Sequence, residues 1–164
     1  MSQTAVPLAP LRINLEQPSD RAAVEALVLA AFGPGRFAKT AERLRERARL
    51  ATGFVAREDG RLIGSVRLWS IMVGDTPALF LGPIAVDTAS RRGGLGADLV
   101  AACIDEARAA GAAGVLLVGD VPYFGRFGFQ PAPDVRLPGP TDPRRVMWLP
   151  ITTVSVSGPV RASD

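Results

Sequence analysis

Histidine is absent from this chain of 164 residues. Without an imidazole, a serine triad of the His type has no general base, and a cysteine nucleophile has no partner that would form its thiolate. Most zinc sites are also excluded, because they combine His with Cys or carboxylate ligands. We therefore expect no bound metal and no covalent intermediate on a histidine-activated nucleophile.

Cysteine and long apolar runs are scarce as well. Cys103 is the single cysteine, so the chain forms no internal disulfide, which fits a reducing compartment. No stretch approaches the roughly 18 apolar residues of a membrane span, and Met1–Pro10 lacks the basic and apolar regions of a signal peptide. We expect a cytoplasmic protein with Cys103 buried in a helix.

Basic residues are numerous but are not gathered in one segment. Nineteen residues are Lys or Arg and sixteen are Asp or Glu, which gives a formal net charge of +3. The arginines are interspersed with acids from Arg12 to Arg161, whereas nucleic-acid-binding domains cluster basic and aromatic residues on one face. We expect neither a nucleic-acid partner nor a membrane partner.

The length predicts one ordinary domain. A chain of this size buries roughly two thirds of its unfolded surface, which is enough for a hydrophobic core. We place the domain at residues 11–152, with a flexible segment at 1–10 and a loose tail at 153–164.

Apolar periodicity and turn residues divide the chain into helices and strands. Asp59-Gly60 separates two alternating apolar runs, which is a strong hairpin signal. The charges of the second helix are expected on a solvated face. The expected strands are 11–15, 54–58, 62–71, 78–86, 115–118, 135–137 and 146–151, and the expected helices are 20–32, 40–50, 95–110 and 122–127.

The middle of the chain predicts the sheet topology. Strand 78–86 is almost entirely apolar, so we expect it to be the central strand, buried on both faces. Strand, helix and strand over 78–118 form a βαβ unit, whose two strands lie parallel. The fold class is therefore a mixed α/β sheet with helices on both faces.

A glycine-rich loop joins the central strand to the next helix. Arg91-Arg92-Gly93-Gly94-Leu95-Gly96 ends where a helix begins, and the first N–H groups of a helix have no internal partner. Glycines let a phosphate approach these groups, and the helix dipole and the arginines favour an anion. The simpler interpretation is a tight turn with two solvated arginines.

Two other phosphate-binding loops fit the sequence poorly. A dinucleotide fingerprint that starts at Gly94 needs its third glycine at position 99, which is Leu99. A Walker loop needs a glycine before its lysine, but Ala38 precedes Lys39, and the segment before it is predicted as a helix.

The loop fits a third pattern, Arg/Gln-x-x-Gly-x-Gly/Ala, through Arg91, Gly94 and Gly96. With this pattern the chain resembles the GNAT (GCN5-related N-acetyltransferase) superfamily. Leu81–Val86 is similar to the fourth strand of that superfamily, and Arg126-Phe127-Gly128-Phe129 is similar to its closing Gly-Phe motif. The run from Gly119 to Phe129 is most similar to bacterial members described simply as N-acetyltransferases.

The resemblance implies a sheet of six to seven strands whose fourth and fifth strands splay apart to admit acetyl-CoA. Pro83 lacks an N–H, so it fits a bulge or gap in the fourth strand. The implied cofactor-binding groups are the strand backbone at Ile84, Ala85 and Val86, and the loop residues Arg91, Arg92, Gly93, Gly94, Leu95, Gly96 and Ala97.

The resemblance also implies direct transfer of an acetyl group to a primary amine of a small molecule or a protein. The superfamily's usual proton donor to the leaving thiolate is a Tyr four residues before the Gly of the Gly-Phe motif, where this chain has Phe124. Tyr123, the single Tyr, lies one place earlier and is the candidate catalytic residue; an aromatic packing role is the alternative. The general base stays open among Glu58, Asp75 and Asp120.

A different class of function fits the same residues. Because Phe124 departs from the usual pattern, the chain could instead be a GNAT-shaped module that binds acyl-CoA without turnover. The acceptor amine is not encoded in any motif. The apolar segment Val146–Ile151 suggests a possible homodimer.

Overall fold

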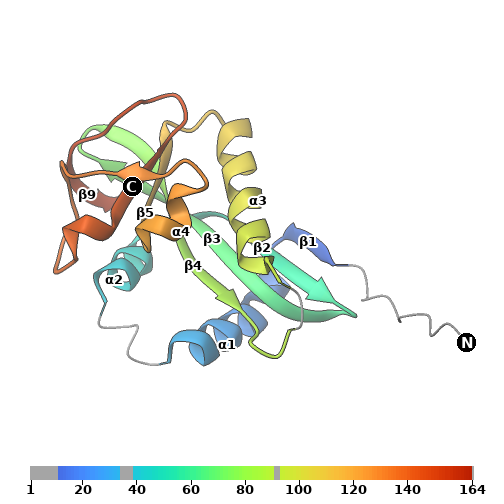
Figure 1. The fold of residues 1–164 in the computed structure, drawn as a ribbon. Coiled ribbons are helices and arrows are strands. Elements are labelled where there is room, and N and C mark those ends of the chain that lie inside the picture. The colour runs from blue at the N-terminus through green and yellow to red at the C-terminus, as the bar shows by residue number, and fades with distance from the viewer. Residues whose placement is uncertain (1–10, 34–38, 91–92, 164) are drawn as a thin grey trace, which may run out of the picture.

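The computed structural model describes residues 11–33, 39–90 and 93–163 (Figure 1). Residues 1–10, the expected flexible segment, lie outside the described residues. The helices are α1 (Arg21–Phe32), α2 (Thr40–Arg47), α3 (Leu95–Ala109) and α4 (Val121–Gly125). The strands are β1 (Arg12–Leu15), β2 (Arg49–Glu58), β3 (Arg61–Val73), β4 (Thr76–Val86), β5 (Gly114–Val118), β6 (Gln130–Pro131), β7 (Val135–Arg136), β8 (Val146–Pro150) and β9 (Gly158–Ala162).

One mixed sheet runs through the molecule in the strand order β1-β2-β3-β4-β5-β8-β6. In addition, β9 pairs with β3, and β7 pairs with β9. The predicted hairpin is present between β2 and β3. Asp59 and Gly60 have φ angles of 52° and 76°, the positive values that a two-residue turn of type I′ requires. The mixed α/β fold class is confirmed.

The predicted βαβ unit is present, because α3 connects β4 to β5 and these two strands are parallel. Their pairing is short. It comprises Leu79 with Val115 and Phe80 with Leu116, and no other pair of the described residues joins the two strands. The remaining half of β4 therefore has a neighbour only on its β3 side.

Helices cover both faces of the sheet (Figure 1). α3 buries an apolar stripe against one face, and α1 and α2 pack on the other through Val24, Val28 and Leu44. Each fully buried aliphatic side chain of this kind contributes about 1.5–3 kcal/mol to stability. The stripe of α3 consists of Leu95, Leu99, Val100, Cys103, Ile104 and Ala107.

The expected loose tail is wrong for Gly158–Ala162, which form strand β9. β2 pairs with β3 only as far as Ser70, so the last residues of β3 have an open edge. β9 occupies that edge from Val73 to Ile71 and buries Val160. With β9 and the two-residue strands β6 and β7, the described part of the sheet has nine strands rather than six to seven.

One helix boundary differs from the sequence-based expectation. The predicted helix 40–50 ends at Arg47, and Arg49 begins β2, where it pairs with Ser70.

The segment 146–151 contains β8, whose side chains from Val146 to Leu149 are buried within this chain. These apolar side chains are therefore not available as a dimer interface.

Candidate active site

A cavity of about 480 Å³ lies where β4 and β5 diverge. Its walls come from the second half of β4, the end of β5, the start of α4, and residues of the α1–α2 region. The lining residues are Phe32, Lys39, Ala41, Glu42, Arg45, Leu81, Gly82, Pro83, Ile84, Leu117, Val118, Gly119, Asp120, Tyr123, Phe124 and Arg145.

β4 carries the predicted irregularity at Pro83. Gly82 and Pro83 together face the single position between Val66 and Leu68 of β3, which is a β-bulge. The indole Nε1 of Trp69 donates to the Gly82 carbonyl oxygen at 2.6 Å and holds the bulge in place. Proline fits here because a bulge leaves one residue outside the ladder of hydrogen bonds.

Backbone polarity alternates along β4 beyond the bulge. Asp87 donates its N–H to the Ile63 carbonyl oxygen of β3 at 2.7 Å. In an antiparallel pair, residues alternate between facing the partner strand and facing away from it. Ile84 and Val86 therefore direct their N–H and C=O groups away from β3, whereas Ala85 directs its groups toward β3.

The glycine loop meets α3 at an open site. Gly93 and Gly94 are exposed, and no heavy atom of the described residues lies within 4 Å of a Cβ built on either of them. Gly94 is the N-cap residue of α3 with a φ of 76°, and no side chain caps the helix. The N–H groups of Leu95, Gly96 and Ala97 belong to the first turn, which has no partners within a helix. Arg91 and Arg92 lie outside the described residues.

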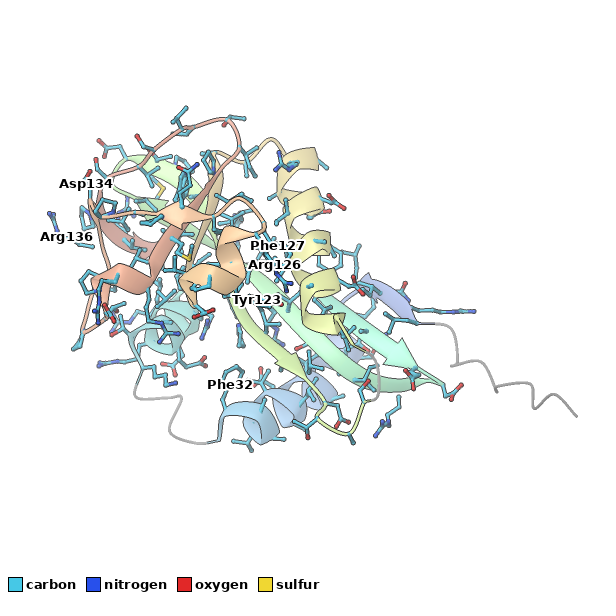
Figure 2. All side chains as sticks on the ribbon, in the orientation of Figure 1. Phe32, Tyr123, Arg126, Phe127, Asp134 and Arg136 are labelled. Carbon is cyan, nitrogen blue, oxygen red and sulfur yellow. The ribbon has the colours of Figure 1, made fainter. Side chains whose placement is uncertain are left out.

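Tyr123 lies next to this first turn of α3. A Cβ built on Gly96 would be 3.4 Å from the Tyr123 hydroxyl oxygen. Asp120, the N-cap of α4, accepts the Tyr123 N–H at 3.0 Å, and the Arg126 guanidinium lies over the Tyr123 ring at 4.2 Å from its centroid. Figure 2 shows Tyr123 close to Arg126 and Phe127 at the α4 end of the molecule. Within the described part of the chain, the hydroxyl has no hydrogen-bond partner.

Phe124 also reaches the cavity, but its ring packs into the core. Its centroid lies 5.9 Å from that of Phe129, and a Cβ on Gly119 would overlap it. The residue at the usual tyrosine position is therefore a packing residue, and the adjacent Tyr123 supplies the only phenol of the chain.

The three candidate bases are in different places. Glu58 ends β2 and Asp75 lies in the turn between β3 and β4, and neither lines the cavity. Asp120 does line it, although its carboxylate also caps α4. The structure therefore retains only Asp120 of these three acids at the cavity.

Two cavity residues that no sequence pattern predicted are Glu42 and Arg45 of α2. Both line the cavity, and they form an ion pair at 3.4 Å with side chains only 11% and 13% exposed. The Arg45 guanidinium also lies 5.8 Å from the centroid of the Phe80 ring. The expectation of a solvated face is thus wrong for these two residues. The apolar spacing of α2 is too sparse to show which side of such a charged helix is buried.

Cys103 is buried in α3, and this desolvation raises the pKa of its thiol to about 12. The thiol is therefore protonated at neutral pH and is unsuited to nucleophilic attack.

No cluster of three or more His, Cys, Asp or Glu residues that could hold a metal occurs in the described ranges. None of the helices in these ranges is long and apolar enough to span a membrane.

Comparisons with known proteins point to one family. The acetyltransferase (GNAT) family profile matches residues 21–129. YhbS of Escherichia coli K12, described as an uncharacterized N-acetyltransferase, is 35% identical over 121 residues, which is 72% of each protein.

Solved structures agree with the sequence comparison. The crystal structure of E. coli YhbS in complex with CoA has a TM-score of 0.81 and 30% identity, covering 99% of this chain and 94% of that one. A GNAT family acetyltransferase from Brucella melitensis, crystallised with acetyl-CoA, has a TM-score of 0.65 and 29% identity, covering 84% and 95%.

Proposed function

The chain belongs to the GNAT acetyltransferase family, and on that basis we propose that it transfers an acetyl group from acetyl-CoA to a primary amine of a small molecule or a protein. The observation that carries the proposal is the divergence of β4 and β5 around a cavity of about 480 Å³. One edge of this cavity is the half of β4 that pairs with β3 but not with β5, and the open N-terminus of α3 follows β4 in the chain.

The glycine loop fits a diphosphate. Apart from the chain neighbours, no described atom lies within 4 Å of a Cβ built on Gly93 or Gly94, and the first-turn N–H groups of α3 have no partner within the helix. We assign the pyrophosphate of CoA to the N–H groups of residues 93–97. Arg91 and Arg92 remain predicted contacts to the same group.

The pantetheine arm would lie along the open edge of β4. Its amide groups are complementary to the backbone N–H and C=O groups of Ile84 and Val86, which face away from β3. One of these N–H groups would also stabilise the negative charge that develops on the thioester oxygen. Ala85 is omitted from these contacts because its backbone groups face β3.

We propose Glu42 as the group that removes the amine proton, since a protonated amine is not a nucleophile. Glu42 is 8% exposed and lines the cavity on the α2 side. Both acids at the cavity already have a partner, since Asp120 accepts the Tyr123 N–H and Glu42 pairs with Arg45 at 3.4 Å. We prefer Glu42 because the carboxylate of Asp120 also caps the start of α4. The amine nitrogen then bonds to the thioester carbon, and the C–S bond breaks.

Tyr123 would donate its hydroxyl proton to the departing thiolate. Its hydroxyl lies beside the first turn of α3, and both Tyr123 and Glu42 line the cavity. The two proton transfers would thus use separate residues, one from α2 and one from α4. Proximity and the strand N–H would provide most of the remaining acceleration.

The test is thiol release from acetyl-CoA with a panel of primary amines, after CoA binding has been measured by calorimetry. Amine-dependent release of CoA supports the enzyme. Tight CoA binding without release from any amine in the panel would favour the non-catalytic module instead.

A further inference from the structure

Arg126 belongs to the Gly-Phe motif but has no part in the reaction proposed above. It is the C-cap residue of α4, and its side chain is exposed. The carbon of its guanidinium lies 4.2 Å from the centroid of the Tyr123 ring and 4.9 Å from that of the Phe127 ring. Figure 2 shows the three side chains together. Two aromatic rings therefore hold a cation that is open to solvent.

The contact with Tyr123 places this cation near the start of α3. The Tyr123 hydroxyl oxygen would lie 3.4 Å from a Cβ built on Gly96, which belongs to the first turn of α3. The Arg126 guanidinium lies over the ring that carries this hydroxyl. One aromatic side chain thus links Arg126 to the helix turn to which we assign the pyrophosphate of CoA.

The hydrogen-bond donors of the Arg126 side chain are not used within the described part of the chain. None of the residues in 11–33, 39–90 and 93–163 forms an ion pair or hydrogen bond with its guanidinium. A cation–π contact is an attraction between the charge and the face of a ring, so it leaves the N–H groups available for oxygen acceptors. Phosphate oxygens suit such a group because they can accept two parallel N–H bonds from one guanidinium.

We propose that Arg126 binds the pyrophosphate of CoA, together with the first-turn N–H groups of α3. The inference rests on the proposed CoA site and extends it to a residue outside the glycine loop. The N-terminus of a helix is equivalent to about half a positive charge, which is less than the negative charge of a diphosphate. A guanidinium held beside the same helix turn supplies further positive charge.

The test is calorimetric titration of CoA, and separately of dephospho-CoA, into the wild type, Arg126→Gln and Arg126→Lys at one ionic strength. Dephospho-CoA keeps the pyrophosphate but lacks the 3′-phosphate, so it separates the two anionic groups of the cofactor. The matched control is Arg12→Gln, which removes an exposed arginine from β1, the strand at one end of the sheet order. Thermal unfolding of each variant confirms that it is folded.

We expect Arg126→Gln to bind CoA and dephospho-CoA more weakly by the same factor, at least about tenfold, because a charge-assisted contact to the pyrophosphate is lost. Arg126→Lys should lose less affinity, since an ammonium keeps the positive charge without the paired donors. Arg12→Gln should bind both cofactors as the wild type does.

Three results would contradict the proposal. Wild-type affinities in Arg126→Gln would leave Arg126 only its contacts with the two rings. A loss for CoA but not for dephospho-CoA would move the contact to the 3′-phosphate, and equal losses in Arg126→Gln and Arg12→Gln would reflect net charge alone. These affinities do not depend on turnover, so an absence of amine-dependent thiol release would overturn the enzymatic proposal without changing them. An absence of CoA binding by the wild type would overturn both proposals.

Discussion

The short helix α4 determines which aromatic side chain can act in the proposed reaction. Consecutive residues of a helix are rotated by about 100° from each other, so Tyr123 and Phe124 cannot face the same way. Phe124 points to Phe129 in the core, and Tyr123 points toward Gly96. In the sequence, the tyrosine stands at position 123, one residue before its usual position in the motif. The structure shows that Tyr123, not Phe124, lies beside α3.

Replacing Tyr123 with Phe removes the proton donor and leaves the ring in place. If Tyr123 protonates the thiolate, kcat should fall by about 10²-fold or more, the usual contribution of a general acid. The affinity for CoA should not change. Steady-state kinetics with calorimetry of CoA binding measures both quantities, and an unchanged kcat would assign Tyr123 a packing role only.

Replacing Glu42 with Gln removes the proposed base. We expect kcat to fall by about 10²-fold at neutral pH while CoA still binds with wild-type affinity. Raising the pH should restore part of the rate of the variant, because more of the acceptor amine is then already deprotonated in solution.

The matched control is Glu46→Gln, one turn further along α2 and exposed. It should keep wild-type kcat and the wild-type pH profile. Equal losses in both variants would show that α2 tolerates no change of charge, and Glu42 would lose its assigned role.

Gly94 is the N-cap of α3 and Gly111 follows its C-cap, Ala110, and the two glycines have similar φ angles of 76° and 68°. A Leu at either position must adopt a left-handed conformation, which lowers stability by about 1–2 kcal/mol. Gly94→Leu should in addition weaken CoA binding at least about tenfold by occupying the phosphate site, whereas Gly111→Leu should not. Urea unfolding and calorimetry test this pair, and similar CoA affinities for the two variants would mean that Gly94 only forms a turn.

At the scale of elements, the ends of strands and helices were predicted less well than their cores. α3 has six regularly spaced apolar residues, and the structure buries all six. β9 has one buried side chain, Val160, and its place is set by an edge of β3 far away in the sequence. Long-range pairing of this kind leaves no periodic signal in a five-residue strand.

Val160 provides a test of β9. Val160→Ala removes two buried methyl groups and should lower the free energy of unfolding by about 1.5–3 kcal/mol. The control is Val154→Ala, because Val154 is 81% exposed and its truncation should change stability by less than about 0.5 kcal/mol. Urea unfolding of the two variants measures the free energy of unfolding of each. Equal free energies for Val160→Ala and Val154→Ala would mean that β9 is not packed in solution.

At the scale of the whole molecule, the sequence carries more signal for the proposed cofactor side of the cleft than for the proposed acceptor side. The proposed cofactor side has a motif, Arg91-x-x-Gly94-x-Gly96, and a strand with a proline at a bulge. The proposed acceptor side includes α2, whose Leu44 packs in one apolar cluster with residues of β3, β4 and β5. With only Glu42 and Leu44 buried in α2, the sequence of this charged helix does not show which of its sides faces the protein.

The central claim is that the glycine loop and the open edge of β4 together hold CoA. A crystal structure of the CoA complex tests this claim most directly. We predict pyrophosphate oxygens within hydrogen-bonding distance of N–H groups of residues 93–97, and the pantetheine arm between β4 and β5 along Ile84 and Val86. A CoA molecule bound elsewhere, or strands β4 and β5 paired along their whole length, would contradict the account.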